Sequence, residues 1–371
     1  MVPLKYQHLQ NKIQLNDLEF TNRLFLAPIS TNACDERGYP TPEFENFYLR
    51  RAKGLVGAII IGATSISEDG GVTKRTQKLY NYSQGKALEK IVRSLKKYCP
   101  VGIQLFHAGG QGNPDYTGYS LYAPSNYIHP PIGHYAKELN IENIKQIIHK
   151  FSESIKISFE SGCDFVELHL AHGYLLHEFL SKHFNKRIDE YGGSPTKRCR
   201  VLFEILESVQ KYSSLHISRI GLKISGEDFV PDGLTTDFYS WLLPKLEKLP
   251  LLYYHVTAGI YDSSSEKKHF MLDGKFQMLA RKIKNMTKKN IITVGNIKNV
   301  EKADTILARG DADIVCMGRA LIADPYLFSK SLGIKKKKFK TALIVIAAIF
   351  YQIIGQMQLL NALKTNKIIK V

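Results

Sequence analysis

The stretch Val166–Ser194 reads VELHLAHGYLLHEFLSKHFNKRIDEYGGS and is the most informative segment of the chain. A short apolar run ends at His169, and His172 and Tyr174 follow directly after it. Two imidazoles and a phenol that leave the end of a buried strand together can hold a carbonyl oxygen and supply a proton. These side chains therefore favour reduction chemistry, provided that an electron carrier binds beside them.

Further short apolar runs recur along the chain, separated by segments with helical periodicity such as Glu142–Glu160 and Lys197–Tyr212. Strands that alternate with helices indicate a parallel sheet, and eight of them can close a (β/α)8 TIM barrel. A doubly wound sheet would normally carry G-x-G-x-x-G after its first strand, which this sequence lacks; the glycine-rich His107–Pro114 is interpreted as a loop. The predicted strands are Arg23–Ile29, Ala58–Ala63, Val101–Phe106, Phe165–His169, Gly221–Ser225, Tyr253–Val256, Ile291–Gly295 and Ile314–Gly318.

The composition is that of a globular protein, with 371 residues of which 44% are hydrophobic and 23% charged. The net charge of +17 comes from basic residues spread along the chain without a nucleic-acid-binding motif, so we predict no nucleic-acid partner. The 5 cysteines are odd in number and form no C-x-x-C pair, which favours neither a disulfide framework nor a zinc knuckle. The first residues lack the apolar core of a signal peptide, and we expect a cytoplasmic protein.

The predicted strand ends carry residues of a particular kind. In a TIM barrel, catalytic side chains lie at the carboxyl ends of the strands, and the loops after strands seven and eight commonly hold phosphate. Small residues, one amide and two cations at these ends would suit a flat, anionic, hydrogen-bonding cofactor. The candidate cofactor-binding residues are Pro28, Ile29, Ser30, Ala63, Gln104, Lys223, Gly295, Asn296, Gly318 and Arg319.

Six segments together make the chain resemble a known family. They are Val166–Ser181, which holds H-x-A-H-G-Y-L-x-x-E-F-L, and LAPIS, GIQLFHAGG, NKRIDEYGGS, TVGNI and CMGRALIADP, which end at Ser30, Gly110, Ser194, Ile297 and Pro325. Over roughly residues 1–333 the sequence resembles the old yellow enzyme family of FMN-dependent oxidoreductases, in the NADH:flavin oxidoreductase and dienoyl-CoA reductase branch. The resemblance implies a TIM barrel that binds FMN, takes hydride from NADH or NADPH, and reduces an activated alkene of the enone or enoate type.

The resemblance also implies roles for the first segment. His169 and His172 match the pair that anchors a carbonyl or nitro oxygen of the substrate, and Tyr174 matches the proton donor. An unperturbed phenol has a pKa of about 10 and is protonated at neutral pH. Two alternatives stay open for the histidines: H-x-x-H can ligate zinc, with Glu178 nearby, or the rings can simply pack in a core.

The cofactor residues receive implied roles in the same way. Gln104 matches the glutamine at the flavin pyrimidine edge, and Arg319 matches the phosphate-binding arginine, with Gly295 on the neighbouring loop. Lys223 stands where most of the family has arginine; lysine keeps the cation that stabilises reduced flavin but loses the planar guanidinium. Ser30 replaces the threonine or cysteine near the flavin C4 carbonyl, so thiol tuning at that position is absent.

Other polar residues near the segment are expected to have structural roles. We predict that His177 and His183 are structural, and that Arg187, Asp189 and Tyr191 form a salt-bridged loop after the fourth strand. His255 and Tyr261 are expected to line the mouth of the substrate site.

The resemblance ends near residue 333. No cysteine follows Cys316, so the iron–sulfur cluster and second flavin domain of the dienoyl-CoA reductase branch are not expected. Residues 334–371 are predicted to form an atypical tail in which a lysine run precedes the uncharged Thr341–Leu360, long enough to span a bilayer but diluted by glutamines. The tail is a membrane anchor, an ordinary helix or a frameshift product. The third alternative arises because the codons of Ala342–Ala348 can spell a cysteine-rich string in the adjacent frame. A truncated barrel with little activity, a membrane-tethered reductase and a homo-oligomer therefore stay open.

Overall fold

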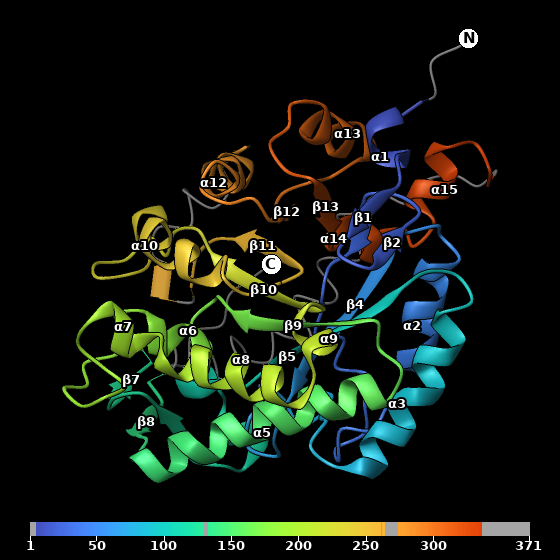
Figure 1. Cartoon of the computed structure of the whole chain (residues 1–371). Coiled ribbons are helices and arrows are strands. Elements are labelled where there is room, and N and C mark those ends of the chain that lie inside the picture. Colours follow the sequence, from blue (N-terminus) through green and yellow to red (C-terminus); the bar gives the residue numbers. More distant parts are fainter. Residues whose placement is uncertain (1–4, 130–132, 261, 264–273, 336–371) are drawn as a thin grey trace, which may run out of the picture.

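The computed structural model describes residues 5–129, 133–260, 262–263 and 274–335. Its centre is a closed barrel of parallel strands in the order β10-β11-β12-β13-β3-β4-β5-β9 (Figure 1). Every predicted strand is present in the barrel, which confirms the TIM-barrel prediction. The strands are β3 (Leu24–Leu26), β4 (Ala58–Ser65), β5 (Val101–Phe106), β9 (Phe165–Leu170), β10 (Ile220–Ser225), β11 (Tyr253–Thr257), β12 (Asn290–Thr293) and β13 (Ile314–Met317).

Amphipathic helices connect the strands and cover the outside of the barrel (Figure 1). The helix predicted over Glu142–Glu160 is α5 (Ile141–Glu160), which begins where the Asn140 side chain accepts a hydrogen bond from the amide of Asn143. The helix predicted over Lys197–Tyr212 is divided at Cys199 into α7 (Pro195–Arg198) and α8 (Arg200–Tyr212). The other helices are α1 (Gln7–Gln10), α2 (Pro42–Ala52), α3 (Tyr82–Leu95), α6 (Leu175–Leu180), α9 (Ser214–Ile217), α10 (Thr236–Leu246), α12 (Lys275–Lys284), α13 (Val300–Ala308), α14 (Arg319–Ala323) and α15 (Leu327–Ser331).

The amino-terminal end of the barrel is closed by a hairpin of β1 (Ile13–Leu15) and β2 (Leu18–Phe20). Phe20 is fully buried, and its ring centroid lies 4.8 Å from that of Phe25 and 5.9 Å from that of Phe165. These rings belong to an interior cluster that is separate from the larger core between the barrel and its helices. The hairpin and the aromatic residues therefore form a floor, so the barrel is open only at its carboxyl end.

A small sheet lies between β5 and α5 in the chain. It pairs β8 (Tyr135–Glu138) with β6 (Leu121–Ala123) and β7 (Tyr127–Ile128). The loop interpreted over His107–Pro114 leads into it and contains the 3-10 turn η1 (Gly109–Gln111) and the start of α4 (Pro114–Thr117). This sheet adds to the carboxyl side of the barrel and was not among the predicted strands.

The predicted tail lies almost wholly outside the described residues, and so does Thr341–Leu360. Within the part of the chain that is described, no helix has both the length and the apolar character needed to cross a bilayer.

Candidate active site

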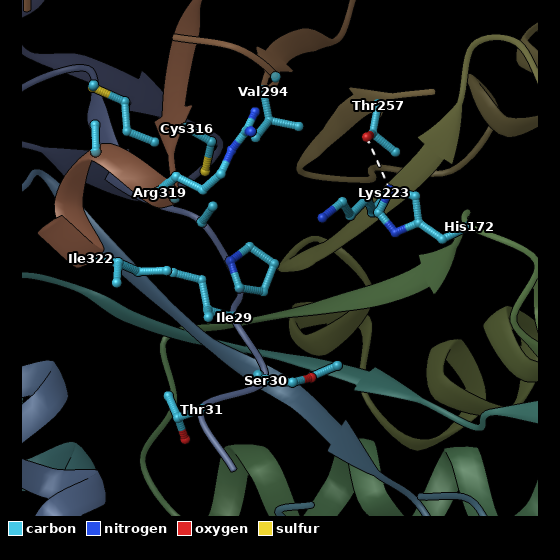
Figure 2. Close-up of a pocket in the computed structure, with 18 of the residues that line it drawn as sticks. Ile29, Ser30, Thr31, His172, Lys223, Thr257, Val294, Cys316, Arg319 and Ile322 are labelled. Carbon is cyan, nitrogen blue, oxygen red and sulfur yellow. Dashed lines mark hydrogen bonds between the residues drawn. The ribbon is translucent and has the colours of Figure 1, made fainter. Parts of the chain in front are cut away.

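A cavity of about 770 Å³ opens at the carboxyl ends of the barrel strands. Its walls come mainly from the loops after β3, β4, β9, β11, β12 and β13, and β10 contributes Lys223 from the strand itself. Figure 2 shows Ser30, Lys223 and Arg319, which come from three different strand ends, around this cavity. This is the end of a TIM barrel at which catalytic sites are found.

The predicted cofactor residues converge on this cavity with one exception. Gln104 does not line it; its side chain is 2% exposed and lies next to Gly62, a lining residue, where an added Cβ would stand 3.0 Å from Gln104 Cβ. Gln104 therefore belongs to the layer of side chains just inside the barrel. The predicted residues that line the cavity are Pro28, Ile29, Ser30, Ala63, Lys223, Gly295, Asn296, Gly318 and Arg319.

One wall of the cavity is apolar and made of small residues. Ala27, Pro28 and Ala63 line it together with Cys316. Burial raises the pKa of the Cys316 thiol well above its usual value, so the sulfur is protonated. Cys34 is 1% exposed and lies outside the lining, and burial raises the pKa of its thiol to about 12. The wall thus offers a flat apolar surface without a reactive thiolate.

Lys223 supplies the cation at the inner end of the cavity. It lies on β10, is 5% exposed, and its side chain reaches into the cavity in Figure 2. Burial lowers the pKa of its ammonium, and Glu167 opposes that shift. No residue that the structure describes is hydrogen-bonded to this ammonium, which leaves it available to an anionic or carbonyl group of a ligand.

The opposite end of the cavity combines backbone with cations. Gly295 has a φ of +114°, and an added Cβ would lie 2.4 Å from the ring of Phe276, so glycine is required there. The side chain of Gln277 donates to the Gly295 carbonyl at 2.9 Å and holds this loop. Arg319 begins α14 on the neighbouring loop, and Lys298 also lines the cavity. A flat apolar wall, an inner cation and an outer basic loop fit a flat ring system with a phosphate tail, which is the shape and charge of FMN.

The predicted catalytic residues form one aromatic group. The ring of His169 lies 5.0 Å from that of His172 and 4.9 Å from that of Tyr174. His172 and Tyr174 line the cavity, whereas His169 is 3% exposed and lies behind them. The strand end positions His169, and the start of α6 positions Tyr174 as its N-cap residue.

Hydrogen bonds and burial set the protonation of the two histidines. Nδ1 of His169 accepts from the amide of Ala171 at 3.2 Å, so the ring proton is on Nε2. Nε2 of His172 lies 3.1 Å from Oγ1 of Thr257. A dashed line marks this hydrogen bond in Figure 2. Burial lowers the pKa of both imidazoles well below the usual value; His172 adds to this effect for His169, and Lys223 adds to it for both. Both rings are therefore neutral and can each donate one N–H.

The residues predicted to be structural are held in their own contacts. His177 pairs with Asp228 at 2.9 Å, and His183 pairs with Asp262 at 2.9 Å. Nε of Arg187 donates to Asp189 at 3.1 Å, which confirms the salt-bridged loop. Within residues 5–129, 133–260, 262–263 and 274–335, no three His, Cys, Asp or Glu side chains are grouped as a metal site would require.

His255 does not line the mouth of the site, and that prediction is wrong. It is fully buried on β11, and its Nδ1 lies 2.9 Å from Oε2 of Glu167 inside the barrel. The error comes from depth along the strand: His255 faces the interior as Thr257 does, but it lies two residues further from the carboxyl end, and Thr257 is the residue that reaches the cavity. Tyr261 lies outside the described residues.

Several lining residues were missed by sequence reasoning, among them Thr257, Phe276 and Lys298. Thr257 could have been found, since it follows the predicted strand Tyr253–Val256 directly, and Lys298 follows TVGNI directly. Phe276 comes from the start of α12, which no motif marks.

The comparisons with known proteins agree with this geometry. The model of the family described as NADH:flavin oxidoreductase / NADH oxidase matches residues 9–337. An NADH oxidase from Thermoanaerobacter brockii is 32% identical over 326 residues, which cover 86% of this chain and 50% of the relative, so the chain spans about half of that protein. An NADPH dehydrogenase from Bacillus subtilis (strain 168) is 29% identical over 320 residues, which cover 85% of this chain and 91% of the relative.

Among solved structures, the old yellow enzyme homologue from Zymomonas mobilis superposes with a TM-score of 0.77 at 24% identity, over 90% of this chain and 94% of the homologue. That similarity concerns the fold, and the family match concerns the sequence that builds the cavity. The chain therefore belongs to the NADH:flavin oxidoreductase / NADH oxidase family, the FMN-dependent NAD(P)H oxidoreductases that include the old yellow enzymes.

Proposed function

We propose that the protein passes hydride from NADH or NADPH through FMN to an activated alkene, such as an enone or enoate. One observation carries this proposal: His172, Tyr174 and Lys223 line the same cavity, and the ring of His169 contacts the first two. Hydrogen-bond donors for a substrate oxygen, a proton donor and a cation for the cofactor thus lie around one cavity. We propose that residues 1–333 form the FMN-binding oxidoreductase domain that contains this cavity.

FMN would supply the chemistry that no side chain can, since it accepts hydride from a nicotinamide and donates hydride to an electron-poor carbon. The residues that would hold it are those at the two ends of the cavity. Lys223 would face the pyrimidine side of the ring system, where its positive charge stabilises negative charge. Arg319, Lys298 and the backbone around Gly295 would hold the phosphate.

The neutral histidines would bind the carbonyl oxygen of the alkene substrate. The Nε2–H of His169 is free to donate because its Nδ1 already accepts from Ala171, and His172 supplies a second N–H. Two donors to one oxygen draw electrons from the conjugated double bond, so its β-carbon accepts hydride. The hydroxyl of Tyr174 would then give its proton to the α-carbon and regain one from solvent.

The similar proteins support a nicotinamide as the electron donor. The electron acceptor is proposed from the residues of the site. An NADPH dehydrogenase and an NADH oxidase are both similar to this chain, so the nicotinamide is proposed as either form. The specific observation for a second candidate is that Lys223, which lines the cavity, stands where the resemblance implies arginine. A barrel that binds FMN but turns over slowly is therefore the alternative.

The test is the absorbance spectrum of the purified full-length protein, reconstituted with FMN if it is colourless. Under anaerobic conditions NADH or NADPH is added first and 2-cyclohexenone second. We expect the yellow colour to bleach with the nicotinamide and to return with the enone. A yellow protein that never bleaches would support the slow barrel, and a protein that cannot take up FMN would contradict the proposal.

A further inference from the structure

The interior of the barrel under the cavity is polar, which is unusual because TIM-barrel interiors are mostly filled by branched apolar side chains. Glu167 on β9 is fully buried at the centre of this layer. Gln104 lies opposite Glu167 on β5, and Tyr253 and His255 come from β11. An isolated buried carboxylate is costly, so its presence here calls for specific partners.

Each carboxylate oxygen of Glu167 accepts at least one hydrogen bond. Oε1 accepts from Nε2 of Gln104 at 2.6 Å, and Oε2 accepts from the hydroxyl of Tyr253 at 3.0 Å and from Nδ1 of His255 at 2.9 Å. The Tyr253 ring fits because Gly221 on β10 has no Cβ, which would lie 2.3 Å from that ring. Burial alone would raise the pKa of Glu167, but His255, Lys223 and Gln104 lower it below its usual value, so the carboxylate is ionised.

An ionised carboxylate accepts hydrogen bonds and donates none, which decides how the Gln104 amide is oriented. Its NH₂ must face Glu167, and its carbonyl oxygen is therefore the atom left for another partner. No donor among the described residues is hydrogen-bonded to that oxygen. A flavin presents an N–H donor between two carbonyls at its pyrimidine edge, and Gln104, which lies beside the lining residue Gly62, would offer that N–H an acceptor.

Glu167 also acts on the charge of Lys223. Both side chains are buried, and Glu167 is the group that most favours the charged form of Lys223. The cation favours the reduced, negatively charged flavin, and the nearby anion opposes it. The pair therefore sets how strongly the cavity favours reduced over oxidised cofactor.

We propose that Glu167 is a positioning residue of the flavin site, which fixes the Gln104 amide for the pyrimidine edge and balances the charge of Lys223. This inference shares with the proposed function the requirement that the protein binds FMN, and it does not require that the protein reduces an alkene. It assigns Glu167 no contact with cofactor or substrate.

The experiment measures the flavin midpoint potential of the reconstituted protein by dye-coupled reduction with xanthine and xanthine oxidase, which needs no alkene substrate. Measurements are made at pH 6, where Lys223 is more fully protonated than at neutral pH. Glu167→Gln removes the charge but keeps an oxygen for Gln104, so we expect the potential to rise. Glu167→Asp keeps the charge and should leave the potential closer to wild type than Glu167→Gln does.

Lys223→Met completes a double-mutant cycle with Glu167→Gln. It also gives a second readout in case the Glu167→Gln variant does not fold. It should lower the potential, and the double variant Glu167→Gln/Lys223→Met should lie between the two single variants. In the apoprotein, Lys223→Met leaves Glu167 without its cation and should lower the melting temperature more than the double variant does. This second readout needs neither FMN nor Glu167→Gln as a single variant.

The orientation of Gln104 is tested by FMN affinity. Glu167→Met leaves the amide free to turn, and we expect a loss of about fivefold to tenfold, as for one hydrogen bond. Adding Gln104→Met should cause little further loss, because the same contact is already lost. Equal potentials in wild type and Glu167→Gln, or a double variant that melts no higher than Lys223→Met, would overturn the inference while FMN binding stands. Failure of the wild type to take up FMN would instead overturn the proposed function.

Discussion

The two ends of the barrel interior are built from different materials. The floor is apolar and closed, with Phe20, Phe25 and Phe165 packed under the hairpin of β1 and β2. The mouth is polar and open, with the histidine pair and Lys223 around the cavity. The same eight strands thus contribute to stability at their amino ends and to the candidate active site at their carboxyl ends.

The difference shows which end of the barrel contains groups whose burial disfavours folding. Neutral imidazoles next to a buried ammonium, and a buried carboxylate beneath them, each oppose folding unless a partner compensates them. The aromatic floor has no such groups and gains from burial alone. Substitutions at the floor should therefore change stability, and substitutions at the mouth should change chemistry, which gives the predictions below.

The largest expected effect is at the mouth. Tyr174→Phe removes the proposed proton donor and should slow the oxidation of reduced enzyme by 2-cyclohexenone by about 10²–10⁴-fold. Reduction by NADPH needs no proton from Tyr174 and should change little, so stopped-flow absorbance can separate the two half-reactions. The melting temperature should stay close to that of wild type. Equal slowing of both half-reactions would mean that Tyr174 positions FMN and is not the proton donor.

The matching change at the floor is Phe20→Ala. It empties a fully buried ring site and should lower the free energy of unfolding by about 3–5 kcal/mol. Urea unfolding followed by circular dichroism measures this loss. FMN affinity of the folded fraction should remain at the wild-type value, because the ring lies at the end opposite the cavity. A weaker FMN affinity in folded protein would show that the two ends are coupled.

The sequence was sufficient for the barrel because hydrophobic periodicity is local. Buried parallel strands such as Ala58–Ala63 are continuous apolar runs, and α5 has the period of an amphipathic helix. The floor hairpin was missed because three-residue strands carry almost no periodic signal. The sheet of β6, β7 and β8 was missed for the same reason.

The site was predictable to the extent that it follows strand ends. Lys223, Gly295 and Arg319 could be assigned because parallel strands all end at the same side of a barrel. The depth of His255 and Gln104 in the barrel interior could not be assigned, because side chains on the same face of a strand occupy different layers and the sequence does not give the layer. The partnership of Gln104 with Glu167 joins residues 63 apart in the chain and has no sequence signal.

A smaller effect concerns acid stability. Among the residues that the structure describes, folding lowers the pKa of five histidines, mainly through burial, and raises that of His183 alone, through its hydrogen bond to Asp262. Below the usual pKa of 6.5 the unfolded chain binds protons that these folded histidines refuse, so stability should fall as the pH decreases from 7 to 5. Melting temperatures of the apoprotein across this range test it. His172→Asn should flatten the slope, and a slope unchanged in that variant would contradict the lowered pKa of His172.

The smallest expected effect separates the two cations of the outer loop. Arg319 can bind a phosphate with two parallel N–H donors, and Arg319→Ala should weaken FMN binding by about tenfold or more. Lys298 is exposed and acts as a point charge on a flexible stem, so Lys298→Ala should weaken binding by only about twofold to fivefold. Fluorescence titration of the apoprotein with FMN measures both. The Lys298 effect should shrink when the ionic strength rises from 0.01 M to about 0.5 M, because screening shortens the reach of an exposed charge. If the two variants lose affinity equally at both salt concentrations, the phosphate is held by charge alone and the proposed bidentate contact of Arg319 is wrong.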